Sequence, residues 1–212
     1  MTPEHTADES PFVTIWESPR ATIRRIVDTD PRRAVNAIFF VAGAVGALDG
    51  FGQWASNFEL PLLAVVPGCL ALGALNVPLG HANAWYKGWV GRLLGGRATR
   101  PEVVAVGAWS TIPVVTSHAV LWAIRLALYG TEVFAAEQPT IDAAPRWLRL
   151  SFTIAGAVFT LWSVTVSVVG FAEVNRFSLV RSIATTLLAT LIAVVSLLVL
   201  VVAMLAAYGL RG

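Results

Sequence analysis

The chain has 212 residues, of which 56% are apolar and only 13% charged, and its mean hydropathy is +0.70. Soluble domains carry about a quarter charged residues, so this composition excludes a soluble globular protein, a disordered chain and a nucleic-acid binder. The single cysteine, Cys69, excludes a disulfide scaffold. An integral membrane protein is the class that fits these numbers.

The N-terminal part is expected to lie outside the bilayer. Residues 1–10 are polar and predicted to be disordered, and residues 11–31 are predicted to form a cytoplasmic amphipathic segment. Ser18-Pro19 is typical of a helix start. A basic amphipathic helix of this kind lies on the inner leaflet, where anionic lipid attracts each arginine by about 1 kcal/mol. The predicted lipid- or partner-binding residues are Trp16, Arg20, Arg24 and Arg25.

The apolar stripe of this segment contains Ile23 and Ile26 and is expected to be covered by lipid. The alternative is a solvated helix that joins a tail to the first membrane span.

Five apolar stretches follow, and a spanning helix needs about 20 mostly apolar residues. We therefore predict an all-α, polytopic membrane protein with a domain of five transmembrane helices over residues 32–212. The predicted spans are residues 34–52, 60–85, 103–129, 152–171 and 183–208. The first is short and contains Asp49 near its end, and the last is the most hydrophobic.

The distribution of Lys and Arg predicts the orientation. Most of these residues fall in three segments on one side of the predicted spans, at 1–33, 86–102 and 172–182. Basic residues in short loops stay in the cytoplasm, so the N-terminus is predicted inside and the C-terminus outside. The preference for Arg over Lys fits a bacterial source, and we expect a multi-pass protein of the bacterial inner membrane.

Small and amide side chains share one face of the second predicted span. The stripe consists of Gly73, Asn76, Gly80 and Asn83. Spacings of three and four residues let a second helix approach closely and hydrogen-bond across the interface. Pro67 and Pro78 interrupt the same helix and could free carbonyl groups for a ligand, as in the broken helices of transporters. A kinked packing interface is the simpler interpretation.

Three ionisable residues at or near membrane depth could carry chemistry: His81, His118 and Glu173. Imidazoles can bind metal or relay protons, but neither histidine has Cys, Asp or Glu within four residues. A structural metal site needs about four ligands, so no metal site is predicted. Arg176 and Arg181 follow Glu173 closely, which favours a local ion pair that anchors this loop over a proton-handling carboxylate.

Three motifs occur in a fixed order. They are Ile-Trp-Glu-Ser-Pro-Arg at 15–20, Gly-Arg-Leu-Leu-Gly-Gly at 91–96 with Ala-Trp-Ser-Thr-Ile-Pro at 108–113, and Val-Gly-Phe-Ala-Glu-Val at 169–174 with Phe-Ser at 177–178. Together they resemble the Yip family of Ypt-interacting membrane proteins, in its bacterial branch. The matched residues are Trp16, Pro19, Trp109, Pro113, Glu173 and Ser178.

The resemblance implies a five-helix membrane bundle with a cytoplasmic N-terminal segment. Eukaryotic members of the family bind prenylated Rab-type GTPases and act in vesicle traffic and membrane shaping. Those members have a longer N-terminal domain, so this GTPase-binding role is not expected here. For the bacterial branch, the resemblance implies no assigned activity and no catalytic role for the matched residues.

The sequence lacks HExxH, Gly-x-Ser-x-Gly, paired aspartates and a His-rich box, so we predict neither an enzyme nor a cofactor. The leading hypothesis is a membrane scaffold or interaction protein. Its expected partners are anionic lipids and an unidentified membrane protein, and a homo-oligomer with a second copy of the chain is a further option. The alternative is a homo-oligomeric transporter or channel for a small solute or ion, in which Asn76, His81, Asn83 and His118 would converge on one cavity.

Overall fold

The computed structural model describes residues 10–55, 62–135 and 137–209, and every element in these residues is a helix. By length and composition, four segments of the described residues could cross a membrane. They are α4 (Leu62–Leu93), the pair α5 and α6 (Arg100–Trp109 and Ile112–Tyr129), α8 (Arg146–Asn175) and α9 (Leu179–Gly209). The first predicted span corresponds to α3 (Val35–Ala55), whose apolar stretch, Val35–Phe51, is shorter. Residues 1–9 lie outside the described part, so the disordered tail stays a prediction.

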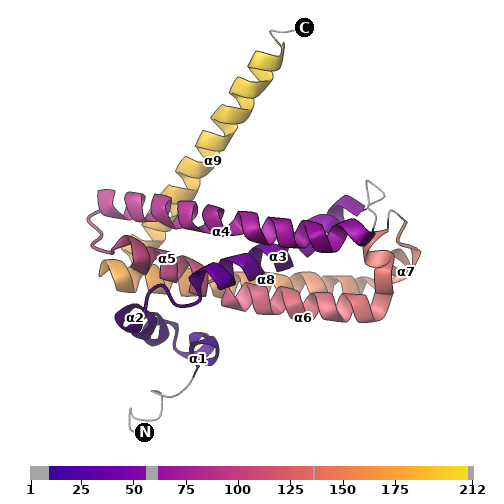
Figure 1. Cartoon of the computed structure of the whole chain (residues 1–212), viewed down its shortest axis with the longest axis horizontal. Coiled ribbons are helices and arrows are strands. Elements are labelled where there is room, and N and C mark those ends of the chain that lie inside the picture. Colours follow the sequence, from indigo (N-terminus) through magenta and orange to yellow (C-terminus); the bar gives the residue numbers. More distant parts are fainter. Residues whose placement is uncertain (1–9, 56–61, 136, 210–212) are drawn as a thin grey trace.

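Helices α3, α4, α6 and α8 run side by side, and α9 leaves this bundle at an angle (Figure 1). The most extensive contact between helices is that of α3 with α4. The small-residue stripe of α4 explains this approach. A Cβ atom at Gly73 would lie 2.9 Å from the backbone oxygen of Phe40, and the Asn76 Nδ2 atom donates to the Phe39 carbonyl at 2.7 Å. Gly73, Asn76 and Gly80 therefore form a helix-packing face directed at α3, whereas Asn83 is exposed.

The third predicted span is two helices, because the chain turns at Ser110 and Thr111 between α5 and α6. Pro113 lies in the first turn of α6 and has no N–H to continue a hydrogen-bond ladder from α5. The Thr111 hydroxyl instead donates to the Ala108 carbonyl at 2.7 Å. This break places α5, most of whose residues are buried, inside one end of the bundle.

The N-terminal segment differs from the expected single surface helix. It forms α1 (Pro11–Glu17) and α2 (Pro19–Thr29), and the predicted start of a helix at Ser18-Pro19 is confirmed. The expectation that lipid covers its apolar stripe is wrong for Ile23 and Ile26, which are 0% and 3% exposed within the protein. They belong to the main buried cluster, together with residues of α5 and α8.

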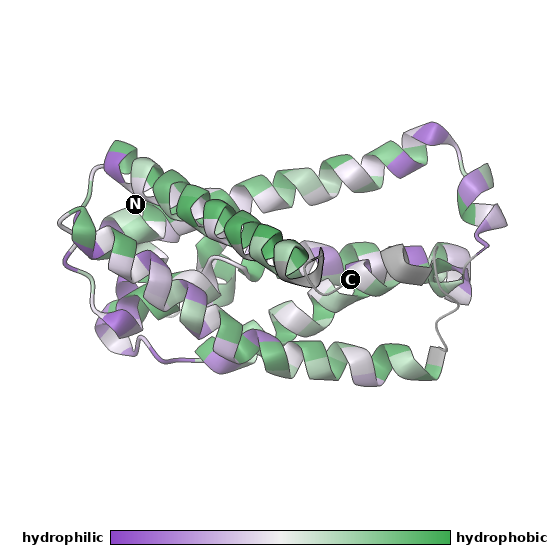
Figure 2. Ribbon diagram, turned by 90° about the horizontal axis from the view of Figure 1, so that it is seen from above, coloured by the Kyte–Doolittle hydropathy of each residue, from purple (hydrophilic) through white to green (hydrophobic). Residues whose placement is uncertain are grey.

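The far end of the bundle is closed by two short elements, η2 (Gly130–Phe134) and α7 (Pro139–Ala143). The Glu132 carboxylate accepts the backbone N–H groups of Thr140 and Ile141, at 2.7 and 3.2 Å, and so caps the start of α7. Hydrophilic residues gather at the two ends of the bundle, whereas α9 is hydrophobic along most of its described length (Figure 2).

Candidate functional site at the basic end

Helices α1, α2 and α5, the α4–α5 loop and the α8–α9 turn meet at one end of the bundle, which we call the basic end (Figure 1). The Arg181 guanidinium ties two of these segments together by donating to the Leu94 carbonyl. The basic residues of this end are Arg20, Arg24, Arg25, Arg32, Arg33, Lys87, Arg92, Arg97, Arg100, Arg176 and Arg181.

Glu173 joins α2 to α8 at this end. Its Oε2 atom lies 3.1 Å from Arg20 Nε, and its Oε1 atom accepts hydrogen bonds from Arg24 Nη2 and Nε at 2.7 and 2.9 Å. The glutamate side chain is 20% exposed and the arginine side chains are 56% and 43% exposed. The expected local pairing with Arg176 or Arg181 is corrected by this geometry, because the ion pairs that the structure gives Glu173 come from α2.

Gly170 lets α2 and α5 approach α8 beside this ion pair. A Cβ atom at this position would lie 3.2 Å from Ile23 Cγ1 and 3.2 Å from Val106 Cγ1. That spacing is tighter than ordinary van der Waals contact, so the absence of a side chain permits the three helices to meet. The resulting contact buries Ile23 completely.

The second and third sequence motifs, with the residues next to them, also contact each other. Gly91 faces the ring of Phe171, and the Asn175 Oδ1 atom accepts the backbone N–H of Ala98 at 3.3 Å. Between them Gly95 has φ +81°, a left-handed conformation that favours glycine. The Gly-rich motif is therefore a tight turn fitted against the end of α8.

The remaining motif residues also serve this packing. Trp109 is fully buried in α5 and its ring centroid lies 4.8 Å from that of Phe12 in α1. Trp16 makes an edge contact with Phe159 of α8 at 5.8 Å between centroids. Ser178 precedes α9, and its hydroxyl accepts the backbone N–H of Arg181. Trp16 and Trp109 thus hold separate segments together, whereas the Ser178 contact is local to the start of α9.

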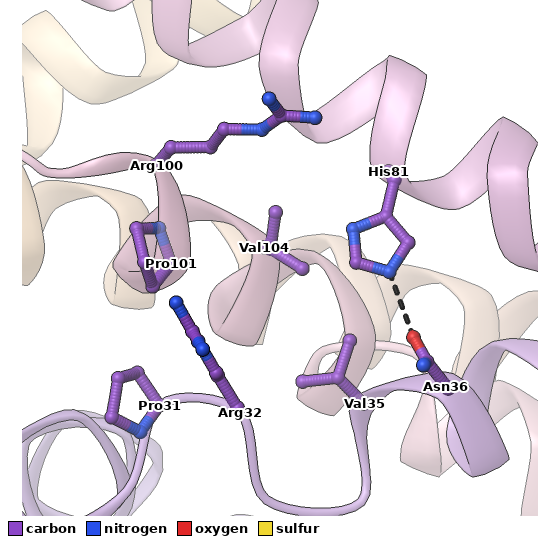
Figure 3. A pocket seen from close by; sticks show the side chains of 8 residues that line it. All are labelled: Pro31, Arg32, Val35, Asn36, His81, Arg100, Pro101 and Val104. Atoms are coloured by element: carbon purple, nitrogen blue, oxygen red, sulfur yellow. Dashed lines mark hydrogen bonds between the residues drawn. The ribbon is translucent and has the colours of Figure 1, made fainter.

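A pocket of about 380 Å³ opens at the basic end between α3, α4 and α5 (Figure 3). Arg32 and Arg100 extend into it from two sides, and His81 lies on a third. The His81 Nε2 atom is 2.8 Å from Asn36 Oδ1, and its ring makes an edge contact with Phe39. His81 is therefore a hydrogen-bonded residue at the margin of a basic pocket.

His118 belongs to a different cluster between α3 and α6. Its Nε2 atom lies 3.2 Å from Asp49 Oδ2, and Trp122 Nε1 donates to Asp49 Oδ1 at 2.8 Å. Arg125 is 3.6 Å from the same carboxylate and lies over the rings of Trp122 and Phe152. Asp49, Trp122 and Arg125 line a second cavity of about 380 Å³. From the sequence, Asp49 was expected only to mark the end of the first span, although an acid in an apolar stretch indicates a polar partner inside the protein.

The four polar residues of the transporter hypothesis have separate surroundings. Asn76 bonds to α3, His81 to Asn36 and His118 to Asp49, while Asn83 is exposed. The structure does not bring them together around one cavity, so the convergence that this hypothesis needed is missing. In the described ranges there is no group of three or more His, Cys, Asp or Glu side chains that could hold a metal ion.

Comparison with known proteins confirms the resemblance to the Yip family. The sequence matches the Yip1 domain over residues 13–205, which is nearly the whole chain. No curated protein and no solved structure matches it. The chain, an integral membrane protein with several apolar helices, therefore belongs to the Yip1-domain family.

Proposed function

We propose that this protein is a non-enzymatic membrane scaffold, which organises a membrane-protein partner and the adjoining lipid surface through its basic end. The observation that supports this proposal most strongly is the collection of basic side chains from separate segments around the docked helices α1 and α2. The proposal places the basic end in the cytoplasm, as the positive-inside rule requires, and the protein in the bacterial inner membrane.

The proposed contact surface is formed by Trp16, Arg20, Arg24 and Arg25 with the neighbouring exposed arginines. Arg20 and Arg24 are held by Glu173 and still keep about half of their side chains exposed. Arg25 is held as well, because its Nη2 atom donates to Thr14 Oγ1 at 3.0 Å. Side chains fixed in this way lose little conformational freedom when an acidic partner binds, which favours recognition.

The test is mild-detergent extraction of the tagged full-length protein from its native membrane, with co-purifying proteins identified by mass spectrometry. The charge reversal R20E/R24E/R25E is expected to remove a reproducible partner, but it also separates α2 from Glu173. The double reversal R33E/R97E therefore changes the charge of the same end without touching that ion pair. We expect both variants to lose the partner by about tenfold, since each reversed charge weakens an electrostatic contact.

The matched control is R146E, which reverses a charge at the other end of the bundle. It is expected to keep the partner. Retention of the same partner by both basic-end variants would contradict the scaffold proposal, and so would equal loss in R146E. Circular dichroism and gel filtration of each variant verify that the helical bundle has formed.

Transport stays the second candidate because of one observation, the Asp49–His118–Arg125 cluster beside its cavity. A carboxylate and an imidazole at membrane depth can relay protons. The test is proton flux into liposomes that contain the purified protein or its D49N variant. Flux that D49N abolishes would favour transport, whereas equal background flux in both would favour the scaffold.

A further inference from the structure

The pocket beside Arg32 and Arg100 plays no part in the packing of α1 and α2 described above. It lies between the segment before α3, the middle of α4 and the first residues of α5 (Figure 3). Its remaining lining is largely apolar and includes Val35 and Val104. None of the lining residues is acidic. Two guanidinium groups therefore share a small, mostly apolar space.

The acidic residues closest to these arginines in the sequence have other partners. Asp30 accepts the backbone N–H of Arg32 through Oδ1 at 2.9 Å, and Glu102 accepts the Thr99 hydroxyl at 2.8 Å. Within the described ranges, no carboxylate is paired with the guanidinium of Arg32 or of Arg100. Planar guanidinium groups bind phosphate oxygens in pairs, so an anion with several such oxygens fits this pocket.

The pocket also offers neutral polar groups beside the two charges. Asn36 lines the pocket and uses Oδ1 for its contact with His81, so its amide nitrogen supplies the N–H donors of this side chain. A carboxylate that could match a choline or ethanolamine ammonium is lacking among the lining residues. This donor set favours an anionic headgroup over a zwitterionic one.

The surface next to the pocket points to a ligand with an apolar part. An adjoining open hollow of about 660 Å³ shares Asn36, His81 and Arg100 and continues over Val77 and Trp85 of α4. Trp85 is 52% exposed and lies at the position expected for the aromatic belt of a membrane interface. A molecule whose phosphate reaches Arg32 and Arg100 would therefore lay its hydrocarbon along this face of α4.

We propose that this pocket binds the phosphate group of an anionic phospholipid, whose acyl chain lies along α4. The proposal rests on the placement of the basic end at a membrane surface and does not depend on any protein partner. It adds Arg32, Arg100 and His81 as lipid-contacting residues. They are distinct from the arginines of α2 that contact Glu173 and Thr14.

The test measures lipid binding to the delipidated full-length protein in detergent by native mass spectrometry. Phosphatidylglycerol and phosphatidylcholine with identical acyl chains are titrated separately. The variant R32Q/R100Q removes the two pocket charges, and the matched control R33Q/R97Q removes two charges from the same end outside the pocket lining. We expect the wild type to prefer phosphatidylglycerol by about tenfold, the pocket variant to lose most of this preference, and the control to change it by about twofold or less.

A conservative variant guards against a loss that comes from misfolding. R32K/R100K keeps both charges but not the planar pair of donors, and it is expected to weaken phosphatidylglycerol binding by about threefold. Equal losses in the pocket variant and in R33Q/R97Q would overturn the proposal, because surface charge alone would then explain binding. A wild type without a preference between the two lipids would overturn it as well.

A separate arm distinguishes a lipid from a soluble phosphate. Inorganic phosphate and glycerol 3-phosphate are added at millimolar concentration, and the thermal unfolding of wild type and R32Q/R100Q is followed. Stabilisation by these compounds that requires Arg32 and Arg100, without phosphatidylglycerol binding, would replace the lipid by a soluble ligand and overturn the proposal. Lipid loss in R32Q/R100Q with retention of the protein partner would separate this site from the scaffold surface.

Discussion

The basic end and α9 both carry large apolar side chains but use them in opposite ways. At the basic end, Trp109 and Ile23 are completely buried against other helices. In α9, Leu198 is 58% exposed, as are most of its large apolar neighbours. Because hydrocarbon is the solvent of a spanning helix, the exposed face of α9 requires lipid or another apolar surface to cover it. Hydrophobicity alone thus does not tell which apolar face meets protein.

What distinguishes the two regions is the presence of small and charged residues that allow close contact. At the basic end, Gly170 lets α2 and α5 pack closely against α8, and Glu173 forms an ion pair with Arg20 beside this contact. The contacts of α9 lie near its start, where Ser182 donates to the Val168 carbonyl at 2.7 Å and Tyr86 to the Ala189 carbonyl at 2.8 Å. The comparison predicts that substitutions at the basic end destabilise the fold far more than similar ones in α9.

The largest effect is expected from Trp109→Ala, which empties a fully buried site in the core of the basic end. The free energy of unfolding should fall by about 3–5 kcal/mol, measured by SDS titration in mixed micelles with circular dichroism as the signal. Trp147→Ala is the control, because Trp147 is 67% exposed, and it should change stability by about 0.5 kcal/mol or less. Similar losses in both variants would contradict the account of the core.

A smaller loss is expected from Gly170→Val, since the new side chain would collide with Ile23 and Val106. Overpacking of this kind costs about 1–3 kcal/mol, and it should also increase protease cleavage between α2 and α3. Gly156→Val provides the control on the same helix, because a Cβ atom at Gly156 meets nothing within 4 Å. If the two variants behave alike, α2 is not packed against Gly170.

The variant Glu173→Gln should weaken the docking of α2 by about 1 kcal/mol, because its two arginine partners are partly solvated. Hydrogen exchange of the α2 amides is then expected to accelerate by about fivefold. Asp28→Asn is a suitable control, since Asp28 also faces Arg24, at 3.9 Å, but is 62% exposed. Unchanged exchange in Glu173→Gln would show that apolar packing alone holds α2.

The smallest effect is predicted for Leu198→Ala on the exposed face of α9. Stability in the SDS titration should change by about 0.5 kcal/mol or less, because the substituted side chain has lipid around it before and after unfolding. A loss of about 2 kcal/mol or more, as at a buried leucine, would mean that protein covers this face. Such a result would remove the contrast between the two regions.

Much of the fold could be predicted from the sequence because helix signals are local. The start of α2 at Ser18-Pro19 and the apolar stretches that became α4, α8 and α9 were identified from neighbouring residues alone. The break between α5 and α6 was missed, although Pro113 is the kind of residue that ends a preceding helix. The apolar stretch of α3, Val35–Phe51, is shorter than the roughly 20 residues that a spanning helix needs, so its length does not decide whether it crosses the membrane.

The candidate site was predicted less well because its contacts join distant parts of the chain. Glu173 was assigned to nearby arginines, but its partners Arg20 and Arg24 lie in α2, and Arg24 is 149 positions away in the sequence. The apolar stripe of α2 indicated that one face is buried, and periodicity does not specify whether lipid or protein buries it. Asp49 and His118 lie in different spans, so only the structure could bring them together.

The most direct test of the docked N-terminal helices is photo-crosslinking from position 16 in native membranes. A benzophenone amino acid replaces Trp16, whose ring lies 5.8 Å from that of Phe159, and the crosslinked peptides are mapped by mass spectrometry. The same probe at the exposed Trp85 provides the lipid-facing control. We expect an intramolecular crosslink from position 16 to the part of α8 around Phe159. Crosslinks to lipid alone, as at position 85, would contradict it.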